Sequence, residues 1–468
     1  MIFKRRQIVV FVFTLVLALS SMACFGSTQS TQTPQPPSPT SPPPPTETPI
    51  PIATSTVEIA TPPVVSTFEI PVSGQVNILE INGFKDEADY WYFYGLVRND
   101  SERTIYDLQI EVNLLDSFGT GVYSYTTNTI LYYLAPGETS PFSDFTTEPF
   151  PDGETMQATL VAQNSTEAIN RANLEYRGIT MWVDDYNDIY LAGEVFNGNP
   201  DPVEINAIAG SLTDETGKLV TASYAYPFLD YVEPNGSGPF VMMFDAPIGQ
   251  AGALTNYALY SDALITNPTS TYDISLSDKP NDYQDNNGDM HLVGSATNNN
   301  TKPMNLFLVA GAYDENRNCI DANTLYVPIP LNPGETFPYD FIMWGALDYV
   351  PAAYEAATQF NINIDWLSTY EASSQAYTLT TEDETHSFDQ SIGTFNGIVV
   401  NNSGQNLTTA IVIVALYDKT SGELIATSYS FVPESMTKDA SGTYEVYLYP
   451  PNDIDPANID IVITALGQ

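Results

Sequence analysis

Residues 95–119 read GLVRNDSERTIYDLQIEVNLLDSFG, and this stretch decides the fold. Its second half places apolar side chains at every second position, at Leu108, Ile110, Val112 and Leu114. That two-residue period is typical of a β-strand with one buried face. The pattern stops at Asp116, with Gly119 close behind, and these two residue types favour a tight turn. The stretch therefore predicts a half-buried strand that runs into a turn.

The same landmarks recur along the rest of the chain. A glycine is followed four residues later by an asparagine at Gly95/Asn99, Gly193/Asn197, Gly294/Asn298 and Gly397/Asn401. Farther along, a strand pattern follows each asparagine and stops at an aspartate. These aspartates are Asp116, Asp214, Asp314 and Asp418. A Pro-containing turn comes next at residues 134–138, 232–236 and 331–335, and the fourth copy keeps only Val432-Pro433-Glu434. Self-similarity at a fixed period indicates homologous repeats, so we predict four modules.

Short strands separated by frequent turn residues predict an all-β fold of antiparallel, immunoglobulin-like β-sandwiches. We expect the four tandem modules at residues 69–166, 167–267, 268–369 and 370–468. In the fourth, Ile411 and Ile413 make the second face of one strand apolar, so that strand should be covered on both sides. A short helix is expected only within residues 351–360.

The repeated pattern resembles the FxLYD domain of exported prokaryotic proteins. The resemblance rests on Gly-x-x-x-Asn, then Val-Ala-Leu-Tyr417-Asp418, or Val-Asn-Leu-Leu-Asp116 in the first module, then Leu-Ala-Pro-Gly-Glu. None of the four modules keeps the phenylalanine that begins the family motif. The resemblance covers roughly residues 70–468 and implies an extracellular β-sandwich, and it brings no catalytic residues with it.

The N-terminus is typical of an export signal. Basic residues at 4–6 precede the apolar run 8–19, which is shorter than the roughly 20 residues of a membrane-spanning helix. The run leads to Ser21-Met22-Ala23-Cys24, which resembles a bacterial lipobox, so we expect a signal peptide at 1–23 and lipid on Cys24. Cleavage by the ordinary signal peptidase, leaving Cys24 unlipidated, is the first alternative, and an uncleaved N-terminal anchor is the second.

A segment rich in Pro, Ser and Thr follows at residues 24–68, and its composition predicts a disordered, extended linker. Localisation is thus expected at the extracytoplasmic face of a cell membrane, through the lipid. The only other cysteine, Cys319, is expected to be a buried apolar residue, with a reactive thiol as the alternative.

The charge balance excludes some partners. The 57 acidic residues against 14 Lys and Arg give a formal net charge of −43, which repels phosphate backbones and argues against nucleic-acid binding. The two histidines, His291 and His386, fall in different modules, which leaves little scope for a zinc site or a Ser-His-Asp triad. We therefore expect a protein that is not an enzyme.

Two groups of residues are candidate binding sites. Asp285, Asn287 and Asp289 alternate around Gly288 and could supply oxygen ligands to calcium, which would be the only cofactor; a solvated turn is the alternative. Trp91, Tyr92 and Tyr94 belong to an aromatic run that must present rings on both faces of a strand, so they could stack on sugars. The alternative is that these rings pack in the core or between modules.

Together these features predict a non-enzymatic cell-surface lipoprotein whose modules bind an extracellular protein or glycan, or act as a spacer. A glycan-binding array that uses the exposed aromatic rings is the first alternative. An envelope hydrolase is a weaker one.

Overall fold

The structure is a computed structural model. It describes residues 76–468 apart from positions 87, 151, 167–168, 186–187, 226–227, 246–253, 255, 268–271, 278–279, 344, 389–391, 434 and 453. All four modules lie in one compact unit of the chain. Within the described ranges, no helix is long and apolar enough to cross a membrane.

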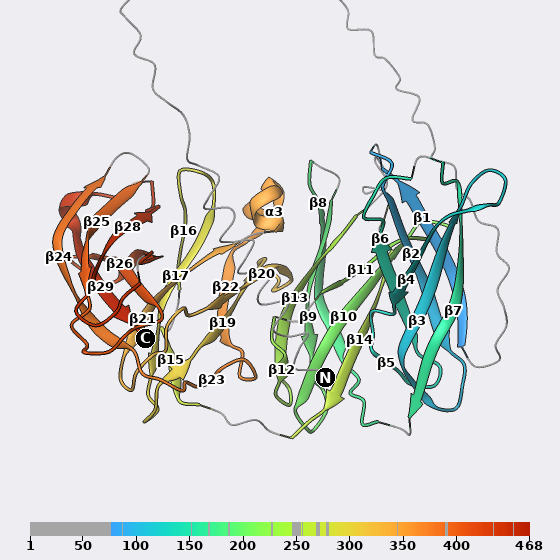
Figure 1. Cartoon of the computed structure of the whole chain (residues 1–468), viewed down its shortest axis with the longest axis horizontal. Helices are drawn as coiled ribbons and strands as arrows, with labels where there is room; N and C mark the ends of the chain where they lie inside the picture. The colour runs from blue at the N-terminus through green and yellow to red at the C-terminus, as the bar shows by residue number, and fades with distance from the viewer. Residues whose placement is uncertain are drawn as a thin grey trace, which may run out of the picture. The chain divides into compact units, whose positions relative to one another are not determined.

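Module 1 is a sandwich of two antiparallel sheets (Figure 1). Its first sheet has the order β1-β2-β6 and comprises β1 (Val76–Lys85), β2 (Trp91–Asn99) and β6 (Thr139–Phe145). Its second sheet is built on β3 (Thr104–Leu115), flanked by β4 (Gly121–Asn128), β5 (Tyr133–Leu134) and β7 (Thr155–Thr166). The chain crosses between the sheets after β2, after β5 and after β6.

Modules 2 and 3 repeat this topology. In module 2 the first sheet contains β8 (Glu175–Val183), β9 (Ile189–Phe196) and β13 (Ser237–Phe244), and the second contains β10 (Val203–Thr213), β11 (Leu219–Ala225), β12 (Tyr231–Val232) and β14 (Asn256–Ile265). In module 3 the first sheet contains β15 (Ile274–Leu276), β16 (Asn281–Gln284), β17 (Met290–Asn298) and β21 (Thr336–Met343), and the second contains β19 (Phe307–Tyr313), β20 (Cys319–Tyr326) and β22 (Gln359–Ile364). A small pair, β18 (Met304–Asn305) and β23 (Tyr370–Glu371), places residues 370–371 in module 3, just beyond the boundary predicted for it.

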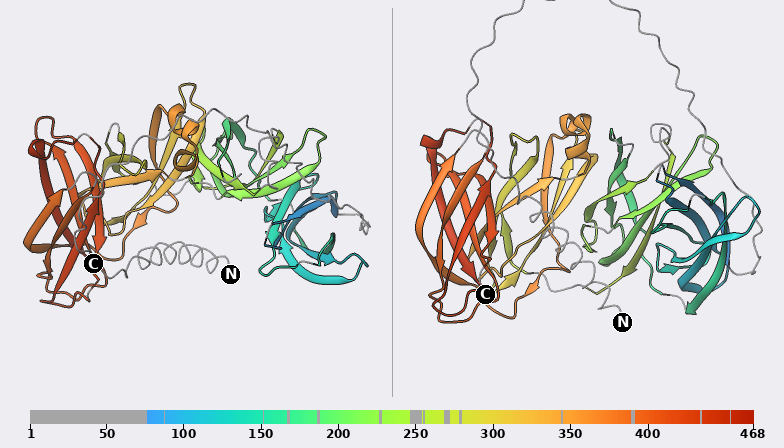
Figure 2. Two further views of the ribbon diagram at one scale, coloured as in Figure 1. Left: turned by 90° about the horizontal axis from the view of Figure 1, so that it is seen from above. Right: turned by 45° about the horizontal axis from the view of Figure 1, so that its top comes forward.

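Module 4 joins its two sheets along one edge. The first sheet contains β24 (Tyr377–Phe388), β25 (Gly393–Val400) and β28 (Ser441–Leu448), and the second contains β26 (Ala410–Asp418), β27 (Leu424–Phe431) and β29 (Ile459–Gly467). The start of β24 pairs with β29 and the rest of it pairs with β25, so six strands form one continuous sheet around the core (Figure 2). A single turn of 3-10 helix, η2 (Pro456–Asn458), precedes β29.

The all-β prediction is confirmed, and so are its local details. Leu108, Ile110, Val112 and Leu114 are buried in the core of module 1, as the alternation predicts. In module 4, Ile411 and Ile413 belong to a hydrophobic cluster of module 3, so β26 is covered on both faces as expected. The expected helix is present as α3 (Pro351–Ala356), next to α2 (Ala346–Tyr349).

The repeated glycine makes room for an aromatic ring. In every module it lies in the central strand of the first sheet, directly opposite an aromatic residue of the neighbouring strand. The four rings are buried and belong to Phe142, Phe240, Tyr339 and Tyr444. A Cβ on Gly95 would overlap the Phe142 ring, and the other three glycines are closed in the same way. The landmark is thus a packing requirement of the sandwich.

The repeated asparagine ties two loops together. Asn99 is fully buried, and its Nδ2 donates to the carbonyl oxygens of Arg103 and Leu134, both at 2.8 Å. Its Oδ1 accepts from the backbone N–H of Ser101 at 3.0 Å. Its backbone carbonyl accepts from Gly137, whose φ of +83° favours glycine. Asn197, Asn298 and Asn401 make the corresponding bonds, so this landmark satisfies buried backbone groups at the end of each sandwich.

The repeated aspartate caps a turn. The Oδ1 atom of Asp116 accepts from the backbone N–H groups of Phe118 at 2.9 Å and Thr120 at 2.8 Å. Asp214, Asp314 and Asp418 cap the equivalent turns. All three landmarks therefore serve the fold of the modules.

Candidate functional site

Consecutive modules meet through the same two surfaces each time. We call each contact a junction. The outer face of the first sheet of one module packs against the strand that follows the aspartate turn in the next module. That strand is β11 against β1, β2 and β6, then β20 against β8, β9 and β13, then β27 against β17 and β21.

One hydrogen bond recurs in all three junctions. The Nδ2 of Asn82 donates to the carbonyl of Leu219 at 2.7 Å in the first junction. The Oγ1 of Thr180 donates to the carbonyl of Cys319 in the second. The Nδ2 of Asn281 donates to the carbonyl of Leu424 at 2.6 Å in the third.

The strand registers show that these bonds are equivalent. Each donor lies directly opposite the residue that precedes the landmark glycine: Tyr94, Ala192 or Val293. Each acceptor is the first residue of its strand and sits at a β-bulge next to the aspartate turn. A side-chain donor and a backbone acceptor that recur at equivalent positions define a common docking geometry.

Apolar side chains surround that hydrogen bond. In the first junction the ring of Tyr94 packs on Leu219 and Ala222. In the second, Ala192 and Val241 pack on Tyr313 and Cys319, and the Tyr313 hydroxyl donates to Glu194 Oε1 at 2.9 Å. In the third, Ile411 and Ile413 join the core of module 3. Burial of apolar surface is the main favourable contribution to such contacts.

A pair of rings flanks each junction. Phe84 and Tyr92 stack with centroids 4.9 Å apart, and Tyr283 and His291 stack at 4.8 Å in the equivalent place of module 3. In module 2 the corresponding pair is Trp182 opposite Tyr190. The hydroxyl of Tyr283 also reaches across the third junction and donates to the carbonyl of Tyr449 at 3.0 Å.

These contacts account for the aromatic run of the first module. Trp91 is 8% exposed in the core, where its Nε1 donates to the Phe150 carbonyl at 3.2 Å. Tyr94 is only 2% exposed and, with Tyr92, belongs to the first junction. These rings therefore pack in the core or between modules, as the alternative states. Sugar stacking by the rings stays a prediction, and their burial does not favour it.

A second contact in the first junction uses one of the few basic residues. Arg171 donates to the carboxylate of Asp262 in module 2 at 2.7 Å and to the carbonyl of Tyr133 in module 1 at 2.8 Å. Its Nη2 lies 3.2 Å from Glu138 of module 1. Burial raises the pKa of Asp262, and the charge of Arg171 opposes that rise. Because both side chains are largely buried, loss of Arg171 would leave the Asp262 carboxylate without its charged partner inside the junction.

A buried histidine with two carboxylates near its ring lies in module 3, beside the third junction. His291 is 2% exposed, its Nδ1 donates to Asp340 Oδ2 at 2.9 Å, and its Nε2 lies 3.8 Å from Asp285 Oδ2. Burial lowers the pKa of His291, but the hydrogen bond and charge of Asp340, with the charges of Asp285 and Asp289, outweigh it, so the net pKa is raised. The equivalent positions of modules 1 and 2 hold Tyr92 and Tyr190.

The residues predicted to bind calcium form the turn between β16 and β17. Asp285 Oδ1 accepts from the backbone N–H groups of Asn287, Gly288 and Asp289 at 2.7–3.0 Å. Asn287 uses its Nδ2 to donate to Asp285 Oδ2 at 3.1 Å. Among the described residues, no group of three or more His, Cys, Asp or Glu is arranged to hold a metal ion. Calcium binding stays a prediction, and the turn alternative accounts for these contacts.

Module 3 also encloses two residues without solvent contact. Cys319 is free and fully buried, as the sequence predicts, and burial raises the pKa of its thiol well above the ordinary value. Asp321 is fully buried and accepts from the backbone N–H groups of Ala322 at 2.8 Å and Leu347 at 3.0 Å. Burial raises the pKa of Asp321 to about 7 in spite of these bonds.

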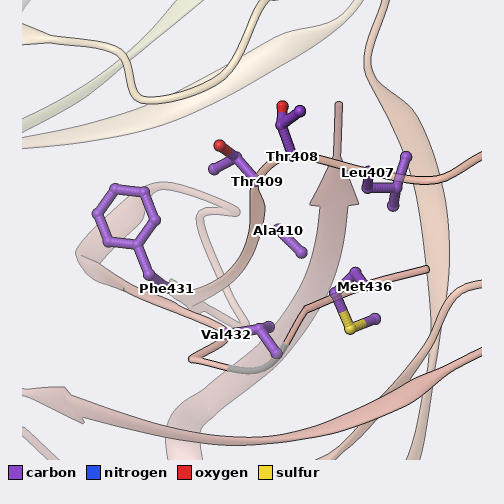
Figure 3. A pocket seen from close by; sticks show the side chains of 7 residues that line it. All are labelled: Leu407, Thr408, Thr409, Ala410, Phe431, Val432 and Met436. Atoms are coloured by element: carbon purple, nitrogen blue, oxygen red, sulfur yellow. The ribbon is translucent and has the colours of Figure 1, made fainter.

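One small pocket opens at the end of module 4. It has a volume of about 150 Å³ and is lined by Leu407, Thr408, Thr409, Ala410, Phe431, Val432 and Met436. Figure 3 shows the two threonine hydroxyls and the Phe431 ring around it. Ligand sites for drug-sized molecules are typically about 300–1,000 Å³, so this hollow is too small to enclose one.

Sequence reasoning identified the modules and offered packing of the aromatic rings between them as an alternative, but it did not predict the junction surfaces, Arg171 or the partners of His291. The junction rings could have been found by aligning the repeats, because Tyr92, Tyr190 and His291 all stand three residues before a landmark glycine. Arg171 and Asp340 carry no repeated signal. The predicted signal peptide at 1–23, Cys24 and the linker at 24–68 lie outside the described residues.

Comparison with known proteins adds little to this picture. No family model matches the chain, and no curated protein is similar to it. Among solved structures, the native conformation of the E. coli alpha-2-macroglobulin, determined by cryo-EM, matches at 9% identity with a TM-score of 0.11. The alignment covers 82% of this chain and 28% of the macroglobulin chain. A TM-score this low supports no conclusion about fold or function. The resemblance to the FxLYD domain stays an expectation.

Proposed function

We propose that this chain is a non-enzymatic, surface-tethered spacer. Lipid on Cys24 would hold it to the extracytoplasmic face of a membrane, and the linker at 24–68 would carry four docked modules that present their surfaces to an extracellular partner. The observation that supports the proposal is the junction hydrogen bond that recurs from Asn82, Thr180 and Asn281. Modules that only happen to be neighbours in sequence would have no reason to share one docking geometry.

A fixed geometry suits a spacer because it limits bending between modules. Flexible linkers alone allow inter-domain motion, whereas a buried apolar contact with a central hydrogen bond opposes it. Two residues that could take part in proton transfer, His291 and Asp321, are both buried and closed off from a substrate. The proposal therefore assigns the chain a mechanical role, with no reaction.

Tethering can be tested with the two cysteines of the chain. Cys24→Ser should release the protein into the medium, whereas Cys319→Ser should leave it in the membrane fraction, because only the first residue lies in the lipobox-like sequence. Retention of the Cys24→Ser variant in the membrane would contradict the anchor.

Spacing can be tested by breaking one junction. Asn82→Ala with Tyr94→Ala removes the central hydrogen bond and the buried ring of the first junction. Small-angle scattering of the variant should show greater flexibility than that of the parent chain, and Asn113→Ala, a partly exposed control in the same module, should not. An unchanged scattering profile in the double variant would show that the junction does not limit bending.

A further inference from the structure

The three junctions are heterologous, since each joins two different surfaces. Among the described residues, a series of modules joined in that way leaves one copy of each surface uncovered. The uncovered first-sheet face belongs to module 4 and is formed by β24, β25 and β28, which lie side by side in Figures 1 and 2. The uncovered strand is β4 of module 1, which follows the turn at Asp116.

The module 4 face keeps part of the docking pattern. Thr385 lies opposite Asn396, the residue before the landmark glycine, so it occupies the place of the donors Asn82, Thr180 and Asn281. Tyr447 is 49% exposed at the rim position held by Phe145 in module 1 and Met243 in module 2. A threonine already serves as the donor in the second junction, so Thr385 needs no change to do the same.

The same face lacks the apolar centre of the three formed junctions. Thr394 stands where Tyr92, Tyr190 and His291 stand, and Asn396 stands where Tyr94, Ala192 and Val293 stand. Ser387, opposite Thr394, replaces the second ring of the pair. The module 4 face therefore keeps the position of the hydrogen-bond donor. At the positions where the other junctions bury apolar side chains, its residues are polar.

Strand β4 offers the complementary acceptor. Gly121 pairs with Leu115 at a β-bulge beside the aspartate turn, which is the position of Leu219, Cys319 and Leu424 in the other modules. Its carbonyl is a backbone group, so the missing side chain does not remove the acceptor. Gly121 and Ser124 are both exposed, and Ser124 takes the place of Ala222.

We propose that the module 4 face formed by β24, β25 and β28 docks strand β4 of a second copy of this chain. The geometry of the three formed junctions specifies the arrangement, which runs head to tail. The contact keeps one hydrogen bond and the exposed ring at its rim. It lacks a buried apolar centre, because Thr394 and Asn396 replace the apolar residues of the other junctions, and this makes its affinity low. The association is therefore weak and reversible, and it is favoured where many copies are held on one surface.

Charge acts against the contact in a predictable way. The chain is strongly acidic, and the module 4 face carries Glu382, Glu384 and Glu445. Two copies repel each other at low ionic strength, and added salt screens that repulsion beyond a distance of about 10 Å at 0.1 M. Association should accordingly strengthen as salt is raised, which is the opposite of contacts between surfaces of unlike charge.

Sedimentation velocity on the full chain carrying Cys24→Ser tests the proposal without the lipid. In 0.5 M NaCl the parent should show weak, concentration-dependent association, as transient contacts of small area do. Thr394→Tyr with Asn396→Ala reproduces the centre of the second junction and should tighten association at least tenfold. Thr378→Tyr, the same kind of change at an exposed position of β24 outside the face, should leave it unchanged.

The species formed are as informative as the affinity. A head-to-tail contact gives an open series whose size grows with concentration, whereas a closed dimer would overturn the arrangement. Ser124→Glu, placed on β4 in the tightened variant, should return it to monomer. Monomers at every concentration for both parent and tightened variant would refute the proposal.

The two proposals fail in different ways. If the scattering of the junction variant is unchanged, the spacer role fails while self-association can still be measured. If the tightened variant stays monomeric while the junction variant becomes flexible, the spacer proposal is supported and the proposed docking of a second copy is refuted.

Discussion

Replacement of Asn99 by alanine tests whether the repeated asparagine is structural. The side chain is fully buried and makes four hydrogen bonds, to the carbonyls of Arg103 and Leu134 and with the N–H and hydroxyl of Ser101. Alanine removes all four and leaves the other protein groups in place.

The expected cost follows from which of those groups can reach water. Ser101 and Arg103 belong to an exposed loop and recover solvent contacts, so their bonds contribute about 1 kcal/mol together. The bond to Leu134 lies in a buried site, and a buried carbonyl that loses a partner costs about 1–3 kcal/mol. We therefore expect the free energy of unfolding of module 1 to fall by about 3 kcal/mol.

Hydrogen exchange followed by mass spectrometry can assign that loss to a module. A fall of about 3 kcal/mol corresponds to exchange faster by about a hundredfold in the strands of module 1, with modules 3 and 4 unchanged. Asn113→Ala is the matched control, since its amide makes a 3.3 Å bond to the Glu111 side chain. An acceleration no larger than that of the control would show that Asn99 is not required for the fold.

Two further predictions concern packing and pH. Gly95→Ala should destabilise module 1 by about 2 kcal/mol, because the new Cβ would overlap the Phe142 ring and lie 2.5 Å from the Glu80 carbonyl; Gly121→Ala, with open space around it, should be neutral in the same urea titration. Asp321, whose pKa burial raises to about 7, holds in the folded state a proton that the unfolded chain releases near pH 4, so module 3 should lose stability as pH rises from about 4 to 7. As pH rises from 5 to 8, the stability of the Asp321→Asn variant relative to the parent should increase by about 3 kcal/mol. The urea midpoint of module 3 at each pH measures this difference. If the midpoints of the two chains change equally with pH, the assignment to Asp321 is wrong.

Much of each module could be predicted from sequence because its landmarks act locally. The alternation of Leu108 to Leu114 predicts which side chains enter the core, and Asp116 caps a turn through amides at most four residues away. The repeat adds further information, because a residue that recurs at the same spacing in four copies is unlikely to do so by chance and therefore indicates a structural position. The recurrence of Gly95 and Asn99 therefore marked the fold before any contact was known.

The candidate binding residues were harder to interpret. Alternation shows that Tyr92 and Tyr94 leave the core of their own sandwich, but it cannot show what covers them. Their partners, Leu219 and Ala222, lie more than a hundred residues away. Asp285 was similarly ambiguous, because a carboxylate that caps a turn and one that binds a cation occur in the same kind of sequence.

By itself, the sequence determined an acidic all-β chain of four homologous sandwiches, with an N-terminus typical of export. It could do so because strand periodicity, turn chemistry and charge depend on neighbours along the chain. Only the tertiary structure decided that the sandwiches dock through one repeated surface, that Asn82, Thr180 and Asn281 are its donors, and that His291 is buried beside Asp340. Those contacts join residues far apart in sequence, and their free energy comes from surfaces that exist only once each module has folded.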